Sequence, residues 1–131
     1  MKINMVGLFT DRFDEMKAFY CSVLRFEIVE ELDSYVEFGG QPMRFAICKR
    51  EVMQQVTGYP GYDQPATGTP FELAFECFSR DELDGRYEVL IAEGAKPVKP
   101  PAVMPWNQYA AFFADPDGHV HELFYRLEKV S

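Results

Sequence analysis

The chain has 131 residues, of which 47% are hydrophobic and 15% aromatic, and its formal net charge is −8. This length is typical of a single domain, and the apolar content is high enough to fill a hydrophobic core instead of leaving the chain disordered. An acidic surface repels phosphate backbones and anionic lipids, so we expect neither nucleic acid nor a membrane as a partner, although the charge can also serve only solubility.

The predicted elements of the first half follow the order β, α, β, β, β. A short apolar segment at 3–10 predicts a strand, and apolar residues at steps of three and four predict a helix over 14–24. Alternating apolar and polar residues then predict a strand over 25–30, and two further short strands are predicted over 34–38 and 43–48. The sequence Gly39-Gly40-Gln41-Pro42 predicts the hairpin turn between the last two.

A segment rich in proline and glycine at 57–70 predicts a loop that links the two halves, with Tyr59 and Tyr62 either at a pocket rim or pinning the loop to the surface. The second half repeats the element order. It has a strand over 71–78, a helix that begins after Ser79 with Glu82 at capping-box spacing, and a stop at Gly94. A short strand at 96–98 and a proline-rich loop at 99–106 follow.

Two further strands, at 107–114 and 118–126, are joined by Asp115-Pro116-Asp117-Gly118, which suits a type I turn. The repeated order predicts an α+β fold of tandem βαβββ modules in one domain, 1–131. Its first module spans 1–56, its linker 57–70 and its second module 71–131.

Cys21, Cys48 and Cys77 lie far apart among apolar residues and form no CxxC motif. No signal-peptide-type segment opens the sequence, and no apolar run approaches the ~20 residues that span a bilayer. We therefore expect a cytoplasmic protein with reduced thiols. The cysteines should be core residues and not nucleophiles, because no basic setting favours a thiolate.

Three stretches resemble the glyoxalase / bleomycin-resistance / extradiol-dioxygenase (vicinal oxygen chelate) superfamily. They are INMVGLFTDRFDEMKAFYCSVLRFEIV at 3–29, PFELAFECFSRDELDGRYEVLIAEGAKPV at 70–98 and PWNQYAAFFADPDGHVHELFY at 105–125. The third is the most specific, because it combines three features in order. A tryptophan precedes a strand, a DPDG turn follows that strand, and Glu-Leu comes three residues after the turn. The resemblance implies two half-barrel modules around one pocket and a homodimer. Catalytic members hold a divalent metal (Ni, Zn, Mn or Fe), whereas bleomycin-resistance-like members bind an organic ligand without one.

The four positions at which the resemblance implies metal ligands are occupied here by Met5, Ala46, Glu72 and Glu122. A thioether is a poor ligand for a hard divalent ion, and a methyl group is no ligand. We therefore favour no metal, with Glu72 and Glu122 as the ligands if one is present. His119 and His121 alternate with Glu122 along their strand, so we expect them to point away from its face, as surface or turn residues.

Arg44 shares a strand face with Ala46, so we expect it to point inward, near one or both of Glu72 and Glu122. Such a cluster has three interpretations: a structural ion pair, a contact with a polar ligand, or a general base with a raised pKa. Trp106 is a candidate for stacking on a ligand or for packing in the core. Three other aromatic residues have the same two interpretations: Tyr35, Tyr109 and Phe113.

We therefore expect a protein that binds a small, aromatic or amphipathic organic molecule in a metal-free pocket lined by Met5, Tyr35, Arg44, Trp106, Tyr109 and Phe113. The alternative is a metal-dependent lyase, isomerase or dioxygenase of the glyoxalase type that uses Glu72 and Glu122. A third possibility is an interaction module whose pocket is filled by its own side chains. The sequence names neither the ligand nor a catalytic residue, because one fold hosts many chemistries.

Overall fold

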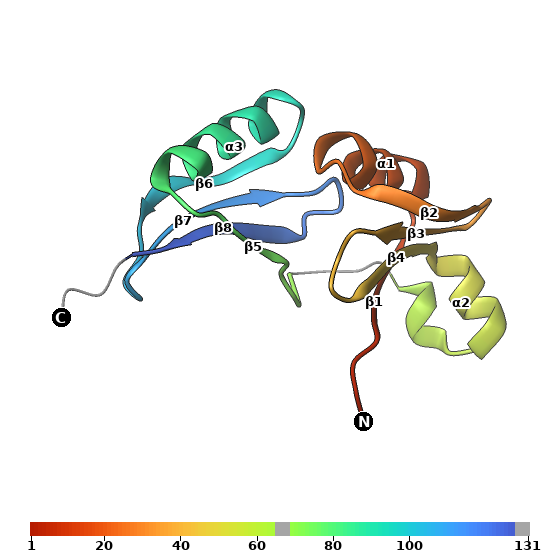
Figure 1. Cartoon of the computed structure of the whole chain (residues 1–131). Coiled ribbons are helices and arrows are strands. Elements are labelled where there is room, and N and C mark those ends of the chain that lie inside the picture. Colours follow the sequence, from red (N-terminus) through yellow and green to blue (C-terminus); the bar gives the residue numbers. More distant parts are fainter. Residues whose placement is uncertain (65–68, 128–131) are drawn as a thin grey trace. The chain divides into compact units, whose positions relative to one another are not determined.

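The computed structural model describes residues 1–64 and 69–127 of the chain. The chain divides into two compact units, Met1–Thr67 and Gly68–Ser131, each with its own four-stranded sheet (Figure 1). Both units contain the order strand, helix, strand, strand, strand. The predicted α+β fold of tandem βαβββ modules is therefore confirmed.

The first sheet has the strand order β1-β4-β3-β2. Its members are β1 (Met5–Thr10), β2 (Glu27–Leu32), β3 (Tyr35–Gly39) and β4 (Arg44–Lys49). Strands β1 and β4 pair in parallel, and the other pairs are antiparallel. Helix α1 (Phe13–Ala18) continues as one π-helical turn, η1 (Phe19–Val23), so the predicted helix is present but changes its winding.

The core of the first unit lies between this helix and one face of the sheet. Tyr20 is fully buried, and its ring centroid lies 5.2 Å from that of Phe45 and 6.3 Å from that of Phe38. Val36 and Ile47 lie on the same face, because side chains alternate along a strand and these two residues are paired. The packed face therefore carries the large apolar side chains of β3 and β4.

Helix α2 (Arg50–Thr57) was missed by the sequence analysis, and a 3-10 turn, η2 (Pro60–Asp63), lies within the predicted linker loop. No residue of α2 is buried, so the helix contributes no side chain to the core. The helix ends at Gly58, whose φ of 68° suits glycine and whose N–H donates to the Gln54 carbonyl. Residues 65–68 of the predicted linker lie outside the described residues.

The second sheet has the order β5-β8-β7-β6 and packs against α3 (Arg80–Ala92). Its strands are β5 (Ala74–Glu76), β6 (Lys96–Val103), β7 (Gln108–Ala114) and β8 (Val120–Arg126). The predicted N-cap is confirmed, since Ser79 Oγ accepts a bond from Glu82 N at 3.0 Å, and Glu82 Oε2 reaches back to accept one from Phe78 N, just before the cap, at 2.8 Å. The predicted turn is also present, with Gly118 N donating to Asp115 O.

Strand β6 corrects the prediction of a proline-rich loop at 99–106, because it continues to Val103. It lies at the edge of the sheet, and its pairing with β7 shifts register between Pro97 and Lys99 and again between Lys99 and Ala102. Proline has no N–H to donate, and edge strands with bulges tolerate that loss. A proline-rich sequence is therefore compatible with a strand at this position.

The structure also bears on the cysteines and on the possibility of a membrane-spanning helix. Cys21, Cys48 and Cys77 are free thiols, and burial raises the pKa of Cys48 and of Cys77, which disfavours the reactive thiolate. Among the residues that the structure describes, no helix is both long and apolar enough to cross a bilayer.

Candidate functional site

Each sheet has a second face, turned away from its helix, that carries some of the candidate site residues. In the first sheet, Met5 pairs with Arg44, Gly7 with Ala46, and Glu37 with Ala46. These residues alternate with the ones that face α1, so they share the other face. We call this set the first site face: Met5, Gly7, Tyr35, Glu37, Arg44 and Ala46.

A three-residue cluster organises the polar part of the first site face. Arg44 donates two hydrogen bonds to the Glu37 carboxylate, from Nε to Oε2 at 3.1 Å and from Nη2 to Oε1 at 2.7 Å. The Tyr35 hydroxyl donates to Glu37 Oε1 at 2.7 Å. The third nitrogen of Arg44, Nη1, donates to Asn4 Oδ1 at 3.3 Å. A bidentate guanidinium–carboxylate pair fixes the orientation of both planar groups.

The cluster keeps Glu37 ionised. The hydrogen bonds from Arg44, then the one from Tyr35, lower the pKa of Glu37 from 4.5 to about 2. The same pairing raises the pKa of Arg44, whereas burial, followed by the bond to Glu37, raises that of Tyr35. The carboxylate side chain is 13% exposed, against 53% for Arg44. The cluster therefore presents a fixed cation to solvent over a carboxylate that is already bonded.

The sequence analysis missed Glu37 and expected Arg44 to pair with Glu72 or Glu122. In its own unit, Arg44 pairs with Glu37 instead. The signal was present in the sequence, since Tyr35 and Glu37 are two residues apart on a strand. The hairpin between the two strands places Glu37 beside Ala46, diagonally next to Arg44.

The rest of the first site face combines the exposed Met5 and Gly7 with the buried Ala46. Met5 is 41% exposed, and its sulfur lies 3.9 Å from the Tyr35 hydroxyl. Gly7 is exposed, and a Cβ at this position would meet only Phe9 Cζ, at 3.8 Å. Ala46 lies between Gly7 and Glu37 in the sheet. The face thus combines a thioether, an open glycine and the fixed polar cluster.

The second sheet has an equivalent face that carries both candidate glutamates. Glu122 pairs with Ala74 on one side and Phe112 on the other, and its N–H donates to the Leu73 carbonyl at 2.9 Å. Glu72 lies two residues before β5, and its carboxylate is close enough to Glu122 to act on the pKa of that group. We call this set the second site face: Glu72, Ala74, Phe112, Glu122 and Phe124.

The two glutamates differ in burial. Glu122 is only 8% exposed, whereas Glu72 is exposed. Burial, and then the nearby Glu72 carboxylate, raises the pKa of Glu122. A buried carboxyl beside a like charge resists ionisation, so Glu122 is the titratable group of this face that most favours holding a proton.

The prediction that His119 and His121 are surface residues was wrong. Both are buried, His121 completely, and they surround the equally buried Asp115. Asp115 Oδ2 lies 2.9 Å from His119 Nδ1 and 3.7 Å from His121 Nε2, and His121 Nδ1 accepts a bond from Leu73 N. The histidines do lie on the helix-facing side of β8, opposite Glu122, because His121 pairs with Phe113 and contacts its ring. That side is the core, where the carboxylate of the turn supplies their polar partner.

The four positions implied as metal ligands do not fit a divalent ion. Met5 and Ala46 offer no hard donor, and Glu37, the carboxylate beside them, is bonded to Arg44 and Tyr35. On the second site face Glu72 and Glu122 carry suitable oxygens, whereas Glu76, on the same side of β5, lies 3.6 Å from Arg126 Nε. Within residues 1–64 and 69–127, no group of three or more His, Cys, Asp or Glu side chains gathers to hold a metal.

The structure places the four aromatic candidates in different environments. Phe113 is fully buried on the helix-facing side, so it fills the core. Tyr109 lies on that side too, where its hydroxyl donates to Asp84 Oδ1 at 2.6 Å and Arg80 covers its ring. Trp106 is 54% exposed in the turn before β7, and its Nε1 donates to Gln108. Of the four aromatic candidates, Tyr35 alone lies on a site face.

The family model described as Glyoxalase/Bleomycin resistance protein/Dioxygenase superfamily matches residues 2–123. A solved glyoxalase/bleomycin resistance protein/dioxygenase from Nocardioides is 27% identical, with a TM-score of 0.88 over 100% of this chain and 87% of that one. A family enzyme from Burkholderia phytofirmans PsJN is 22% identical, with a TM-score of 0.85 over 97% and 100%. A lactoylglutathione lyase from Agrobacterium tumefaciens is 22% identical, with a TM-score of 0.73 over 95% and 92%, and shares the fold. No curated protein matches the chain.

Proposed function

Because the chain belongs to the glyoxalase/bleomycin resistance protein/dioxygenase superfamily, we propose that it binds a small aromatic or amphipathic molecule on the first site face without a metal. The observation that carries this proposal is the Tyr35–Glu37–Arg44 cluster. Its Glu37 carboxylate already accepts hydrogen bonds from Tyr35 and Arg44, each at 2.7 Å. It is therefore a poor metal ligand, and it holds the Arg44 guanidinium in one orientation.

The cluster and its apolar neighbours match the two halves of such a ligand. A guanidinium held flat by two hydrogen bonds can stack on an aromatic ring, and its remaining N–H groups can donate to a carbonyl or hydroxyl oxygen. The exposed Met5 thioether can contact the edge of the same ring. At the exposed Gly7, only Phe9 Cζ lies within 4 Å of the position that a Cβ would take, which leaves room for the ligand over the sheet.

A metal-dependent lyase, isomerase or dioxygenase is the second candidate. The observation that favours it is the burial of Glu122, which, together with the nearby Glu72 carboxylate, raises the pKa of Glu122. Paired carboxyl groups with a perturbed pKa are common at catalytic sites. The donor set counts against this candidate, because Met5 and Ala46 replace two of the implied ligands.

Methyl NMR on chelator-treated protein labelled at the methionine methyl groups tests the first candidate. The probes are small aromatic ketones, phenols and aromatic carboxylates. We expect the exposed Met5 methyl to shift with at least one class, while the buried Met16 methyl, which is 0% exposed, stays unchanged. Arg44→Met should remove the shift.

The matched control is Arg86→Met, since Arg86 is an exposed arginine on α3 that pairs with Glu82 outside both site faces. Binding that Arg86→Met and Arg44→Met weaken equally would contradict a role for the cluster. If every probe shifts Met5 only after metal is restored, the second candidate replaces the first.

A further inference from the structure

A separate polar crevice opens in the first unit, at the carboxyl ends of β1 and β4. It has a volume of about 360 Å³ and is lined by residues 10–15 and 49–51; we call it the Lys49 crevice. Thr10 and Lys49 are the last paired residues of these parallel strands, and each strand leads into a helix. The carboxyl edge of parallel strands is a recurrent position for ligand sites.

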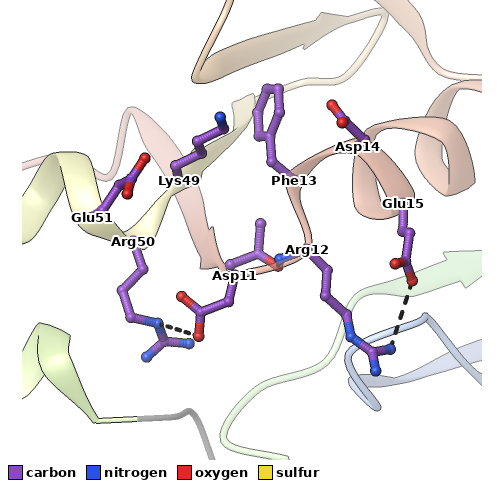
Figure 2. A pocket seen from close by; sticks show the side chains of 9 residues that line it. Asp11, Arg12, Phe13, Asp14, Glu15, Lys49, Arg50 and Glu51 are labelled. Atoms are coloured by element: carbon purple, nitrogen blue, oxygen red, sulfur yellow. Dashed lines mark hydrogen bonds and ion pairs between the residues drawn. The ribbon is translucent and has the colours of Figure 1, made fainter.

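Much of the charge that lines the crevice is paired internally. Arg50 Nε lies 3.4 Å from Asp11 Oδ2, and Arg12 Nη1 lies 3.7 Å from Glu15 Oε2. The Arg50 side chain is only 12% exposed and also donates from Nη1 to the Gln64 carbonyl at 2.7 Å. These two ion pairs form one wall of the crevice (Figure 2).

Three charged side chains remain on the other side: Lys49, Asp14 and Glu51. In Figure 2 they extend in the same direction as the Phe13 ring, away from the two ion pairs. The Lys49 amino group lies 6.0 Å from the Phe13 ring centroid and, within the described part of the chain, makes no hydrogen bond or ion pair with a side chain. Lys17, the other cation near Phe13, is already bonded to Glu31 at 2.8 Å.

We propose that the Lys49 crevice binds a small zwitterion of the α-amino acid class. The ligand carboxylate pairs with the Lys49 ammonium, and the ligand ammonium pairs with Asp14 or Glu51. Charge-assisted hydrogen bonds of both signs then form at once. The first N–H groups of α2 support the carboxylate, because this helix begins at Arg50 without a side-chain cap.

Ligands of a single charge fit the crevice less well. An anion would meet Lys49 but also the carboxylates of Asp14 and Glu51, and the net charge of −8 adds to this repulsion. A simple amine would satisfy the carboxylates and leave Lys49 unpaired. Only a molecule with both charges pairs with Lys49 and with one of the two carboxylates at the same time.

The crevice also limits the rest of the ligand. Its volume lies at the small end of the range for ligand pockets. Phe13, its one large apolar side chain, is 5% exposed, so little apolar surface is available for contact. We therefore expect amino acids with small or polar side chains to bind better than aromatic ones.

Backbone amide NMR of the full chain tests the proposal with glycine, L-serine and L-phenylalanine as zwitterionic probes. Acetate and methylammonium carry one charge each and serve as matched controls. We expect glycine and L-serine to shift the amides of residues 49–52 and 13–14 in the millimolar range, with each single-charge control weaker by roughly tenfold or more.

Lys49→Met should weaken glycine binding by roughly tenfold, and Lys49→Arg should restore part of it. Lys99→Met, at an exposed lysine of β6 in the other unit, should leave binding unchanged. Glu51→Gln, at an exposed position, provides an independent loss of affinity if Lys49→Met disturbs folding. The proposal is overturned if no amide of the crevice responds to glycine, or if acetate or methylammonium binds as tightly.

Discussion

Substitution of Arg44 should change the ionisation of Glu37 by an amount that the geometry of the cluster sets. The pKa of Glu37 is about 2, against an ordinary value of 4.5. The hydrogen bonds from Arg44 are the largest cause, the bond from Tyr35 is the second, and burial opposes both. Arg44→Gln removes the charge and the bidentate pair, so the pKa of Glu37 should return most of the way to 4.5.

Tyr35→Phe removes only one donor, so it should raise the pKa of Glu37 by a smaller amount than Arg44→Gln does. The assay is a pH titration of the Glu37 side-chain carboxyl carbon by NMR, in the wild-type protein and both variants. Arg86→Gln is the control and should leave the Glu37 titration in place. A Glu37 pKa that stays near 2 in Arg44→Gln would refute the argument that Arg44 holds this carboxylate.

The same pair links stability to acid pH. Because the folded pKa of Glu37 lies below its ordinary value, the pair stabilises the folded state above about pH 4.5, and this contribution is lost as the pH falls toward 2. In Arg44→Gln the free energy of unfolding should decline less steeply across that window. Urea unfolding at several pH values measures the difference.

Three other predictions concern the second unit. Ser79→Ala should lower the free energy of unfolding by about 1 kcal/mol, measured by urea denaturation, because it removes the cap on Glu82 N; no change would contradict the N-cap. Phe113→Ala should cost roughly 3–5 kcal/mol in the same assay, since the ring is fully buried; a loss below about 1 kcal/mol would place the ring outside the core. The hydrogen bond to Asp115 raises the pKa of His119 in the folded protein. The His119–Asp115 pair therefore stabilises the fold fully below pH 6.5, and this contribution is lost as the pH rises through the folded pKa of His119. Asp115→Asn should flatten this pH dependence of unfolding, and an unchanged slope would rule out the pair as its source.

Local chemical signals allowed the sequence to predict much of the fold. The Ser79 N-cap and the turn that begins at Asp115 each depend on a few neighbouring residues, and both are present. The edge strand β6 could not be predicted in the same way. Its prolines indicate a loop, and only its place at the sheet edge, with two register shifts, makes a strand possible.

The site was harder to predict because its contacts join residues on different strands. Glu37 and Arg44 meet across the β3–β4 hairpin, and a sequence shows the register of that hairpin only to within a residue or two. His121 shows a different limit. Alternation correctly placed it opposite Glu122, but its burial depends on Asp115 and Leu73, which supply its polar partners from other segments.

The measurement that tests the central claim most directly is the metal content of purified, untagged protein after equilibration with Ni²⁺, Zn²⁺, Mn²⁺ and Fe²⁺. Elemental analysis should find far less than one metal per chain, because Met5 and Ala46 supply no hard donor and Glu37 is already bonded. One metal per chain in the wild-type protein, lost in Glu122→Ala, would contradict a metal-free site and establish the second site face as a metal centre.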